Sequence, residues 1–202
     1  MHRYRVDPVP QVLPLRYWKP IQTGIETEDD TREVGRLGVC TSGEVLASGI
    51  RLPRPVSPHL AARLSGQTID LDGLLARIDA EPPARWIVEG AGGVLVPIND
   101  AHAMVHLMLR LALGVVVVSR TTLGTINHTL LTIEALRARA LTVAGVLMVG
   151  PPNRDNCDAI ERYGLVRVVG EMPMFNPLTP DALRRWALAS LDPAGRLLEY
   201  VE

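Results

Sequence analysis

The chain has few cysteines, no excess of positive charge and no long apolar run, and each shortage excludes a class of protein. The two cysteines, Cys40 and Cys157, form no CxxC pair, so the sequence predicts neither a zinc site nor a disulfide framework and favours the reducing cytoplasm. A formal net charge of −1 provides no basic surface for nucleic acid and no polybasic segment for a membrane. The longest apolar run, residues 104–118, is interrupted by His106 and Arg110 and is too short to span a bilayer.

What the chain does contain suits one folded domain. Its 202 residues, 47% of them hydrophobic, are sufficient to bury a core. The N-terminus lacks the pattern of a signal peptide, in which a basic segment leads into an apolar one. We therefore expect residues 1–202 to form a single domain, in which residues 1–14 are divergent or irregular.

Short apolar runs alternate with helical patterns along the chain. Residues 115–118 are all valine, which is typical of a strand buried on both faces. Strands are predicted at residues 17–18, 86–88, 115–118, 143–149 and 166–169. Helices are predicted at residues 29–37, 57–66, 126–140, 155–163 and 181–191. This alternation predicts an α/β domain with a mainly parallel sheet flanked by helices.

Polar residues follow predicted strands at three places, and ligands in open parallel sheets bind beyond the carboxyl ends of the strands. The first place is Glu89, which precedes a turn rich in glycine, residues 90–93. A carboxylate there can hold Mg²⁺, and glycines let backbone amides approach a phosphate. A tight turn without a ligand is the alternative interpretation.

The other two places are the stretches YWKPIQTG and SRTTLGTINHTLLT. Lys19 follows a strand and precedes Pro20, so it can neutralise phosphate or carbamate charge, or be an ordinary surface lysine. Gly124 lies where a helix begins, and a helix N-terminus presents free amides to an anion, although ordinary capping also explains the pattern. The histidines show no metal-ligand spacing.

Taken together, these stretches resemble the dethiobiotin synthetase family. The motifs that occur in the order and approximate spacing of that family are YWKPIQTG, EDDTREVGRLG, VSPHLAA, VEGAGGVLVPIN, LGTINHTLLT and GEMP, from about Leu15 to about Pro180. The resemblance implies a homodimeric, P-loop NTPase-like enzyme that uses ATP and Mg²⁺. Such an enzyme closes the ureido ring of dethiobiotin from 7,8-diaminononanoate and carbon dioxide, through a carbamate that ATP phosphorylates.

The resemblance also implies roles for individual residues. Lys19 stabilises carbamate and phosphoryl charge, and Thr23 contacts the substrate. Asp30, or Asp29 if the register shifts by one, lies near Mg²⁺ and ATP, and Glu89 binds the metal. The remaining implied sites are the phosphate-side turn Gly90, Ala91 and Gly92; the substrate-carboxylate site Leu123, Gly124, Thr125, Ile126 and Asn127, donated across the dimer interface; and the base pocket Pro173, Met174 and Phe175.

One element of the family pattern is missing from this sequence. In the family, a first strand, a GxxxxGK[ST] loop and a first helix precede the YWKP motif, whereas the residues before Tyr17 contain no glycine and three prolines. Either the start of the chain is assigned late or garbled, or the protein has lost ATP chemistry and acts as a ligand-binding or partner subunit. The adenine-reading asparagine of the family is also replaced by Val149-Gly150, and Asn153 and Asn156 are candidates to substitute for it.

Overall fold

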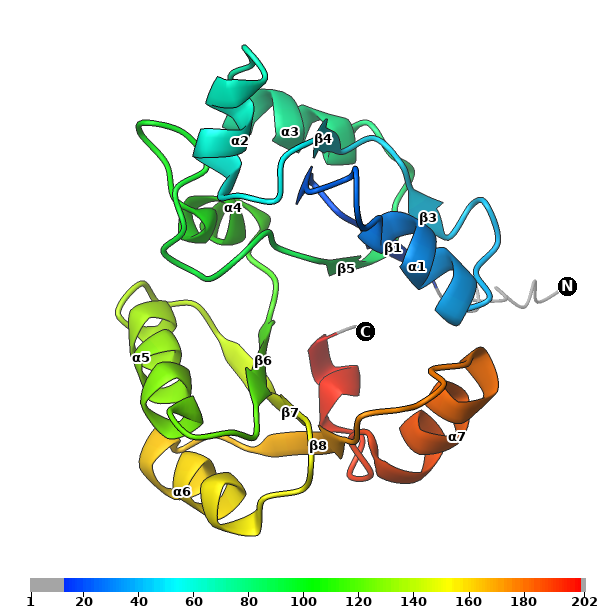
Figure 1. Ribbon diagram of the computed structural model, residues 1–202, viewed down its shortest axis with the longest axis vertical. Helices are drawn as coiled ribbons and strands as arrows, with labels where there is room; N and C mark the ends of the chain where they lie inside the picture. Colours follow the sequence, from blue (N-terminus) through cyan, green and yellow to red (C-terminus); the bar gives the residue numbers. More distant parts are fainter. Residues whose placement is uncertain (1–12, 201–202) are drawn as a thin grey trace, which may run out of the picture.

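The computed structural model describes residues 13–200, which contain eight β-strands, seven α-helices and one 3₁₀ helix (Figure 1). The strands are β1 (Leu15–Trp18), β2 (Ile21–Thr23), β3 (Val45–Leu46), β4 (Ile50–Leu52), β5 (Arg85–Val88), β6 (Val115–Arg120), β7 (Val143–Val149) and β8 (Val168–Met172). The helices are α1 (Asp30–Leu37), α2 (Pro58–Leu64), α3 (Leu71–Asp79), α4 (Met104–Leu111), α5 (Thr125–Arg137), α6 (Arg154–Gly164), α7 (Pro180–Ser190) and the 3₁₀ helix η1 (Arg196–Tyr200).

All pairings between named strands in these residues are parallel, and they form three small sheets. The orders are β3-β1-β5, β2-β4 and β6-β7-β8. The prediction of a mainly parallel α/β fold is therefore confirmed. None of the helices in the described part of the chain has both the length and the apolar character needed to cross a membrane.

Local sequence signals explain where several helices begin. Asp29 and Thr179 cap α1 and α7, because each side chain accepts a hydrogen bond from the backbone amide three residues later. Pro58 and Pro180 occupy first-turn positions, where the missing N–H costs nothing. These starts agree with the sequence prediction to within one or two residues.

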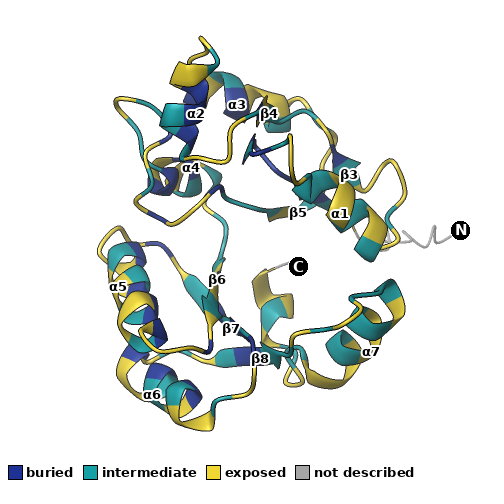
Figure 2. Cartoon of the chain, viewed as in Figure 1, coloured by how far each residue is buried: buried dark blue, intermediate teal, exposed yellow. Residues whose placement is uncertain are grey.

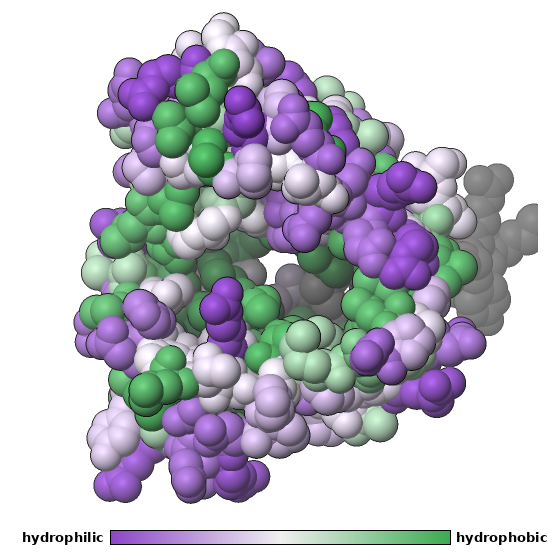
Figure 3. All heavy atoms as spheres, viewed as in Figure 1, coloured by the Kyte–Doolittle hydropathy of each residue, from purple (hydrophilic) through white to green (hydrophobic). Residues whose placement is uncertain are grey.

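The molecule has two hydrophobic cores, one in each half of the chain (Figure 2). The first core contains Trp18 and side chains of α2 and α3, and the second lies between β6, β7, α5 and α6. Helix α4 joins them, since Met104 and Leu107 belong to the first core and Val105 to the second. We call residues 13–111 the N-terminal part and residues 115–200 the C-terminal part. The space-filling view shows an opening between the two parts (Figure 3).

The structure corrects the prediction that the strand at residues 115–118 is buried on both faces. Val117 is buried, but Val116 and Val118 are 38% and 65% exposed. The β-branched sequence was read correctly as a strand, yet one face of that strand has no cover from the described residues. The strand expected at residues 166–169 also begins two residues later, and β2, β3, β4, α3, α4 and η1 were not predicted. Most of the region expected to be irregular, residues 1–14, lies outside the described residues.

Candidate functional site

The candidate site lies beyond the carboxyl ends of β1 and β5, which pair in parallel. Trp18 is the last residue of β1 and Val88 the last of β5, and the two are register partners. Lys19 and Glu89 are therefore the next residues of two adjacent strands. The amide of Glu89 continues the ladder by donating to the carbonyl of Trp18 at 2.9 Å. This pairing is what brings together two residues that are 70 positions apart in sequence.

Lys19 is buried, with 6% of its surface exposed, and its ammonium group lies close to three oxygen atoms. Its Nζ lies 2.7 Å from Glu89 Oε1, 2.6 Å from Asp30 Oδ2 and 3.1 Å from the carbonyl of Gly90. The contacts with Glu89 and Gly90 are hydrogen bonds that the ammonium donates, and the contact with Asp30 is an ion pair. The ammonium is thus fixed between two carboxylates whose side chains are 37% and 44% exposed.

Tyr17 holds the second oxygen of the Glu89 carboxylate. Its hydroxyl donates a 2.6 Å hydrogen bond to Glu89 Oε2. Burial, and then the bond to this carboxylate, raise the pKa of the Tyr17 hydroxyl far above its usual value, so it remains a donor. The sequence analysis missed Tyr17, although strand alternation indicates that it lies on the same face as Lys19.

The two neighbouring aspartates at the start of α1 have different partners. Asp29 caps the helix and forms an ion pair with Arg51 at 2.6 Å. The hydrogen bond from Arg51 is the main reason that the pKa of Asp29 is lowered. Asp30 turns instead towards Lys19. This geometry favours Asp30 over Asp29 as the aspartate of the site.

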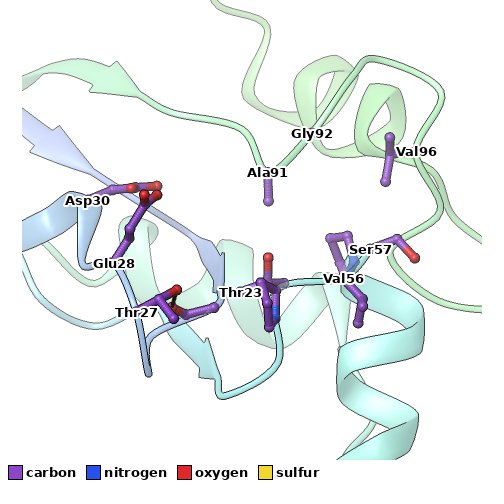
Figure 4. Close-up of a pocket in the computed structure, with 12 residues that line it drawn as sticks. Thr23, Thr27, Glu28, Asp30, Val56, Ser57, Ala91, Gly92 and Val96 are labelled. Atoms are coloured by element: carbon purple, nitrogen blue, oxygen red, sulfur yellow. Dashed lines mark hydrogen bonds between the residues drawn. The ribbon is translucent and has the colours of Figure 1, made fainter.

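A pocket of about 440 Å³ adjoins this cluster (Figure 4). Thr23 lies at its centre, the carboxylates of Glu28 and Asp30 lie together on one side, and Ala91 and Gly92 lie across from Thr23. The structure thus brings Thr23, Asp30 and the glycine turn to one cavity. Glu28 is a lining residue that the sequence analysis did not single out.

The glycine turn after β5 has the backbone that a close approach requires. Gly92 has φ +80°, and a Cβ added there would lie 3.1 Å from a methyl group of Val96. Left-handed backbone of this kind favours glycine. Gly90 contributes its carbonyl to Lys19, and Ala91 is buried. The predicted phosphate-side turn therefore borders the lysine–carboxylate cluster.

The predicted carboxylate site at the start of α5 is separate from this pocket. Gly124 precedes the helix with φ +93°, and the hydroxyl of Thr125 donates back to the carbonyl of Arg120 at 2.5 Å. Leu123 is fully exposed, and Asn127 is exposed as well. Among the described residues, then, these side chains do not line the cavity that contains Thr23.

The predicted base pocket lies in the C-terminal part, after β7 and β8. Residues 173–175 follow β8 directly, and Met174 is 73% exposed. The side-chain amides of Asn153 and Asn156 both donate to the carbonyl of Thr121, at 3.4 and 3.0 Å. These asparagines therefore join the loops after β6 and β7 at the same edge of the sheet.

The residues present fit a magnesium ion. Asp30 and Glu89 offer hard oxygen donors, which Mg²⁺ prefers, and each is exposed enough to leave room for the water that Mg²⁺ retains. Each carboxylate also has lone pairs beyond those used by Lys19 and Tyr17. Lys19 is the only lysine in the sequence, which has 20 arginines. This contrast is a signal in the sequence that the position favours a compact ammonium group over a planar guanidinium.

Comparison with known proteins identifies the family. A family model described as an AAA domain matches residues 10–182. Three relatives are each named ATP-dependent dethiobiotin synthetase BioD. The Agrobacterium fabrum protein is 42% identical over 86% of this chain and 80% of its own length. The Nitrobacter hamburgensis protein is 45% identical over 83% of this chain and 78% of its own length. The Paramagnetospirillum magneticum protein is 47% identical over 81% of this chain and 77% of its own length. The α/β fold, the motifs around Lys19 and Glu89 and these similarities agree, and the chain belongs to the dethiobiotin synthetase family.

Proposed function

We propose that this protein is a ligase of biotin biosynthesis that makes dethiobiotin from 7,8-diaminononanoate, carbon dioxide and ATP. The observation that carries the proposal is the Lys19 ammonium held between Asp30 and Glu89 beside an open pocket. The reaction passes through anions at every stage, so it needs a fixed positive charge next to a phosphate site.

The reaction has three steps. One amine of the substrate adds to carbon dioxide, and loss of a proton leaves a carbamate. A carbamate oxygen then attacks the γ-phosphorus of ATP, and ADP departs, which leaves a carbamic–phosphoric anhydride. The second amine attacks the carbonyl carbon of this anhydride, and phosphate leaves with the bonding electrons. The attacking nitrogen loses a proton, and the ureido ring is then complete.

The positions of the chain's own residues support the roles that we propose for them. Lys19 neutralises the negative charge of the carbamate and of the phosphoryl group that is transferred to the carbamate. Thr23, at the centre of the pocket, donates a hydrogen bond to the substrate. The backbone amides of Gly90, Ala91 and Gly92 face the phosphate groups. Positioning and charge neutralisation are the main sources of rate in such a transfer.

Asp30 and Glu89 would hold Mg²⁺, which when bound offsets the charge of the triphosphate. Both carboxylates pair with Lys19, so a bound cation would share them with its ammonium group. The neighbouring Tyr17 keeps the Glu89 carboxylate oriented by its hydrogen bond.

The remaining contacts involve a second copy of the chain. We propose a homodimer in which Leu123, Gly124, Thr125, Ile126 and Asn127 of one protomer bind the distant carboxylate of the substrate held by the other. The exposure of Leu123 and Asn127 supports this arrangement, because donated residues must project outward. Residues 173–175 would line the adenine pocket, and the cytoplasm stays the expected compartment.

The test is phosphate release by the protein purified from its natural source. With 7,8-diaminononanoate, bicarbonate and MgATP, we expect release that depends on both the diamine and bicarbonate. No release from verified full-length protein would contradict the proposal. The alternative is a ligand-binding or partner subunit without turnover. That candidate predicts diamine binding by calorimetry with no phosphate release.

A further inference from the structure

The pocket beside Lys19 contains a second carboxylate, that of Glu28. Glu28 lines this cavity together with Asp30, and Figure 4 shows the two side chains lying together on one side of it. Asp30 forms an ion pair with Lys19, whereas Glu28 forms no ion pair with any residue in the range 13–200. The negative charge of Glu28 is therefore available to a cation that enters the pocket.

The backbone of Glu28 is fixed by the residues around it. Its amide donates to the carbonyl of Gly24 at 3.0 Å, and its carbonyl accepts a hydrogen bond from the side chain of Gln22 at 3.2 Å. The hydroxyl of the preceding Thr27 also donates to the carbonyl of Gly24, at 3.0 Å. Glu28 thus occupies a defined place on the pocket wall, unlike a carboxylate on an unanchored turn.

The side chain of Gln22 opposes any displacement of this segment. Gln22 lies in β2 and is 2% exposed, and burial of an amide costs free energy unless the amide is hydrogen-bonded. Within the described part of the chain, its Nε2 bonds to the carbonyl of Glu28 and its Oε1 has no partner. Movement of Glu28 away from the pocket would leave both ends of the buried amide unsatisfied.

The wall across from the carboxylates is largely apolar. Its apolar lining residues are Pro55, Val56, Pro58, Ala91 and Val96. Figure 4 shows Val56 and Val96 on the side of the pocket opposite Glu28 and Asp30. A cavity with an anionic end and an apolar wall suits an aliphatic compound that carries positive charge at one end.

The substrate of the proposed reaction carries such a charge. Aliphatic amines are ammonium ions at neutral pH, since the pKa of a lysine side chain is about 10.4. In a diamine with amines on neighbouring carbons, the two positive charges repel each other, which lowers the pKa of the second amine. One amine therefore stays protonated while the other reacts with carbon dioxide. The resulting intermediate has a carbamate anion beside an ammonium cation.

The site offers the complementary pair of charges. Lys19 provides the positive charge for the carbamate, and Glu28 provides a negative charge for the neighbouring ammonium. Asp30 and Glu89 are already paired with Lys19 and would hold Mg²⁺. Glu28 is thus the carboxylate of the pocket that is left for the substrate.

We propose that Glu28 binds the ammonium group of the diamine, and so determines which amine stays protonated while the other takes up carbon dioxide. This inference rests on the proposed function, because it places 7,8-diaminononanoate in this pocket. Glu28 is then a specificity residue, which favours the diamine over a compound of the same chain length without amines.

The test measures binding of 7,8-diaminononanoate by calorimetry, without ATP. Glu28→Gln keeps the shape of the side chain and removes its charge. Glu26→Gln is the matched control, because Glu26 is exposed and lies outside the lining of the pocket. We expect Glu28→Gln to weaken binding about three- to tenfold, less at high salt, and Glu26→Gln to leave it unchanged. Unchanged affinity in Glu28→Gln, or equal losses in both variants, would overturn the proposal.

A second ligand shows whether the ammonium is the group that Glu28 recognises. Nonanoate has the chain length of the substrate but neither amine. Its affinity should therefore not fall in Glu28→Gln, because no ammonium loses its partner. A loss as large as that for the diamine would reflect a general change in the pocket and would contradict the proposal.

Two further measurements separate this role from metal binding and from turnover. Binding of Mn²⁺, followed by electron paramagnetic resonance, should be the same in Glu28→Gln and the original protein. A loss as large as that in Asp30→Asn would make Glu28 a metal ligand and overturn the proposal, as would an original protein that binds no diamine. Diamine binding that depends on Glu28, without phosphate release, would support the role of Glu28 while contradicting the proposed reaction.

Discussion

The hydroxyl of Tyr17 donates a 2.6 Å hydrogen bond to Oε2 of Glu89, 72 residues later in the chain. Lys19 binds the other oxygen of the same carboxylate. Tyr17 in β1 and Lys19 directly after it therefore fix both oxygens of the carboxylate that follows β5. The carboxylate is oriented before any ligand arrives, which lowers the cost of ordering it on binding.

Removing the Tyr17 hydroxyl should change stability most clearly at alkaline pH. The folded state raises the pKa of Tyr17, so above about pH 10 the unfolded chain loses this proton while the folded chain keeps it. Stability from this group is complete below pH 10 and declines above it by up to about 1.4 kcal/mol per pH unit. Tyr17→Phe should remove this contribution to the slope and cost about 1 kcal/mol at neutral pH.

The measurement for Tyr17→Phe is urea unfolding between pH 7 and pH 11. Tyr163→Phe, at a side chain that is 67% exposed, is the matched control and should keep the alkaline slope of the original protein. The interpretation fails if Tyr17→Phe leaves that slope intact.

Replacing Lys19 by methionine should have opposite effects on turnover and on cation binding. Phosphate release should fall roughly 100-fold or more, because the charge next to the phosphate site is lost. Affinity for Mg²⁺ should rise several-fold, because Asp30 and Glu89 lose the ammonium that neutralises them. Calorimetry with Mg²⁺ measures the second effect, and an unchanged or weaker affinity would argue against a shared cation site.

Lys19 also provides a direct spectroscopic signal, since it is the only lysine in the sequence. Protein labelled with ¹⁵N-lysine should give one side-chain Nζ resonance. Addition of Mg²⁺ should shift it, because the cation competes for the same carboxylates. A resonance that does not move at saturating Mg²⁺ would place the cation elsewhere.

Substitutions at Asp29 and Asp30 should separate helix capping from the metal site. Asp29→Asn keeps an oxygen for the cap and loses the ion pair with Arg51, so it should leave Mn²⁺ binding unchanged. Asp29→Ala should lower the free energy of unfolding by about 1 kcal/mol through loss of the cap. Asp30→Asn should instead weaken Mn²⁺ binding, measured by electron paramagnetic resonance. If only Asp29→Asn weakened Mn²⁺ binding, Asp29 and not Asp30 would be the aspartate of the site.

The two glycines at the end of the turn should respond differently to alanine. Gly92→Ala places an alanine in left-handed backbone, with its methyl group 3.1 Å from a methyl group of Val96. This substitution should lower the free energy of unfolding by about 1–2 kcal/mol. Gly93→Ala meets Val96 only at 4.0 Å and should change stability by less than about 0.5 kcal/mol. Chemical denaturation of the two variants gives the comparison. Equal losses would show that φ at Gly92 is not the cause.

Local sequence patterns were sufficient for much of the fold. The strand at residues 143–149 and the starts of α1 and α7 agree with the prediction, because caps, prolines and β-branched runs act over a few residues. The short strands β2 to β4 were missed because each has two or three residues, too few to show a period. Their existence depends on pairing partners and not on their own sequence.

The candidate site, too, could be predicted only in part from the sequence. The sequence by itself determined that Lys19 and Glu89 each follow a strand, and the motifs around them identified the family. Only the tertiary structure decided that these two side chains meet, that Asp30 and not Asp29 joins them, and that Tyr17 completes the cluster. It also decided that Val118 is exposed, because burial depends on what covers a strand. The reason is physical: capping and strand propensity arise from neighbouring residues, whereas pairing between β1 and β5 joins segments 70 residues apart.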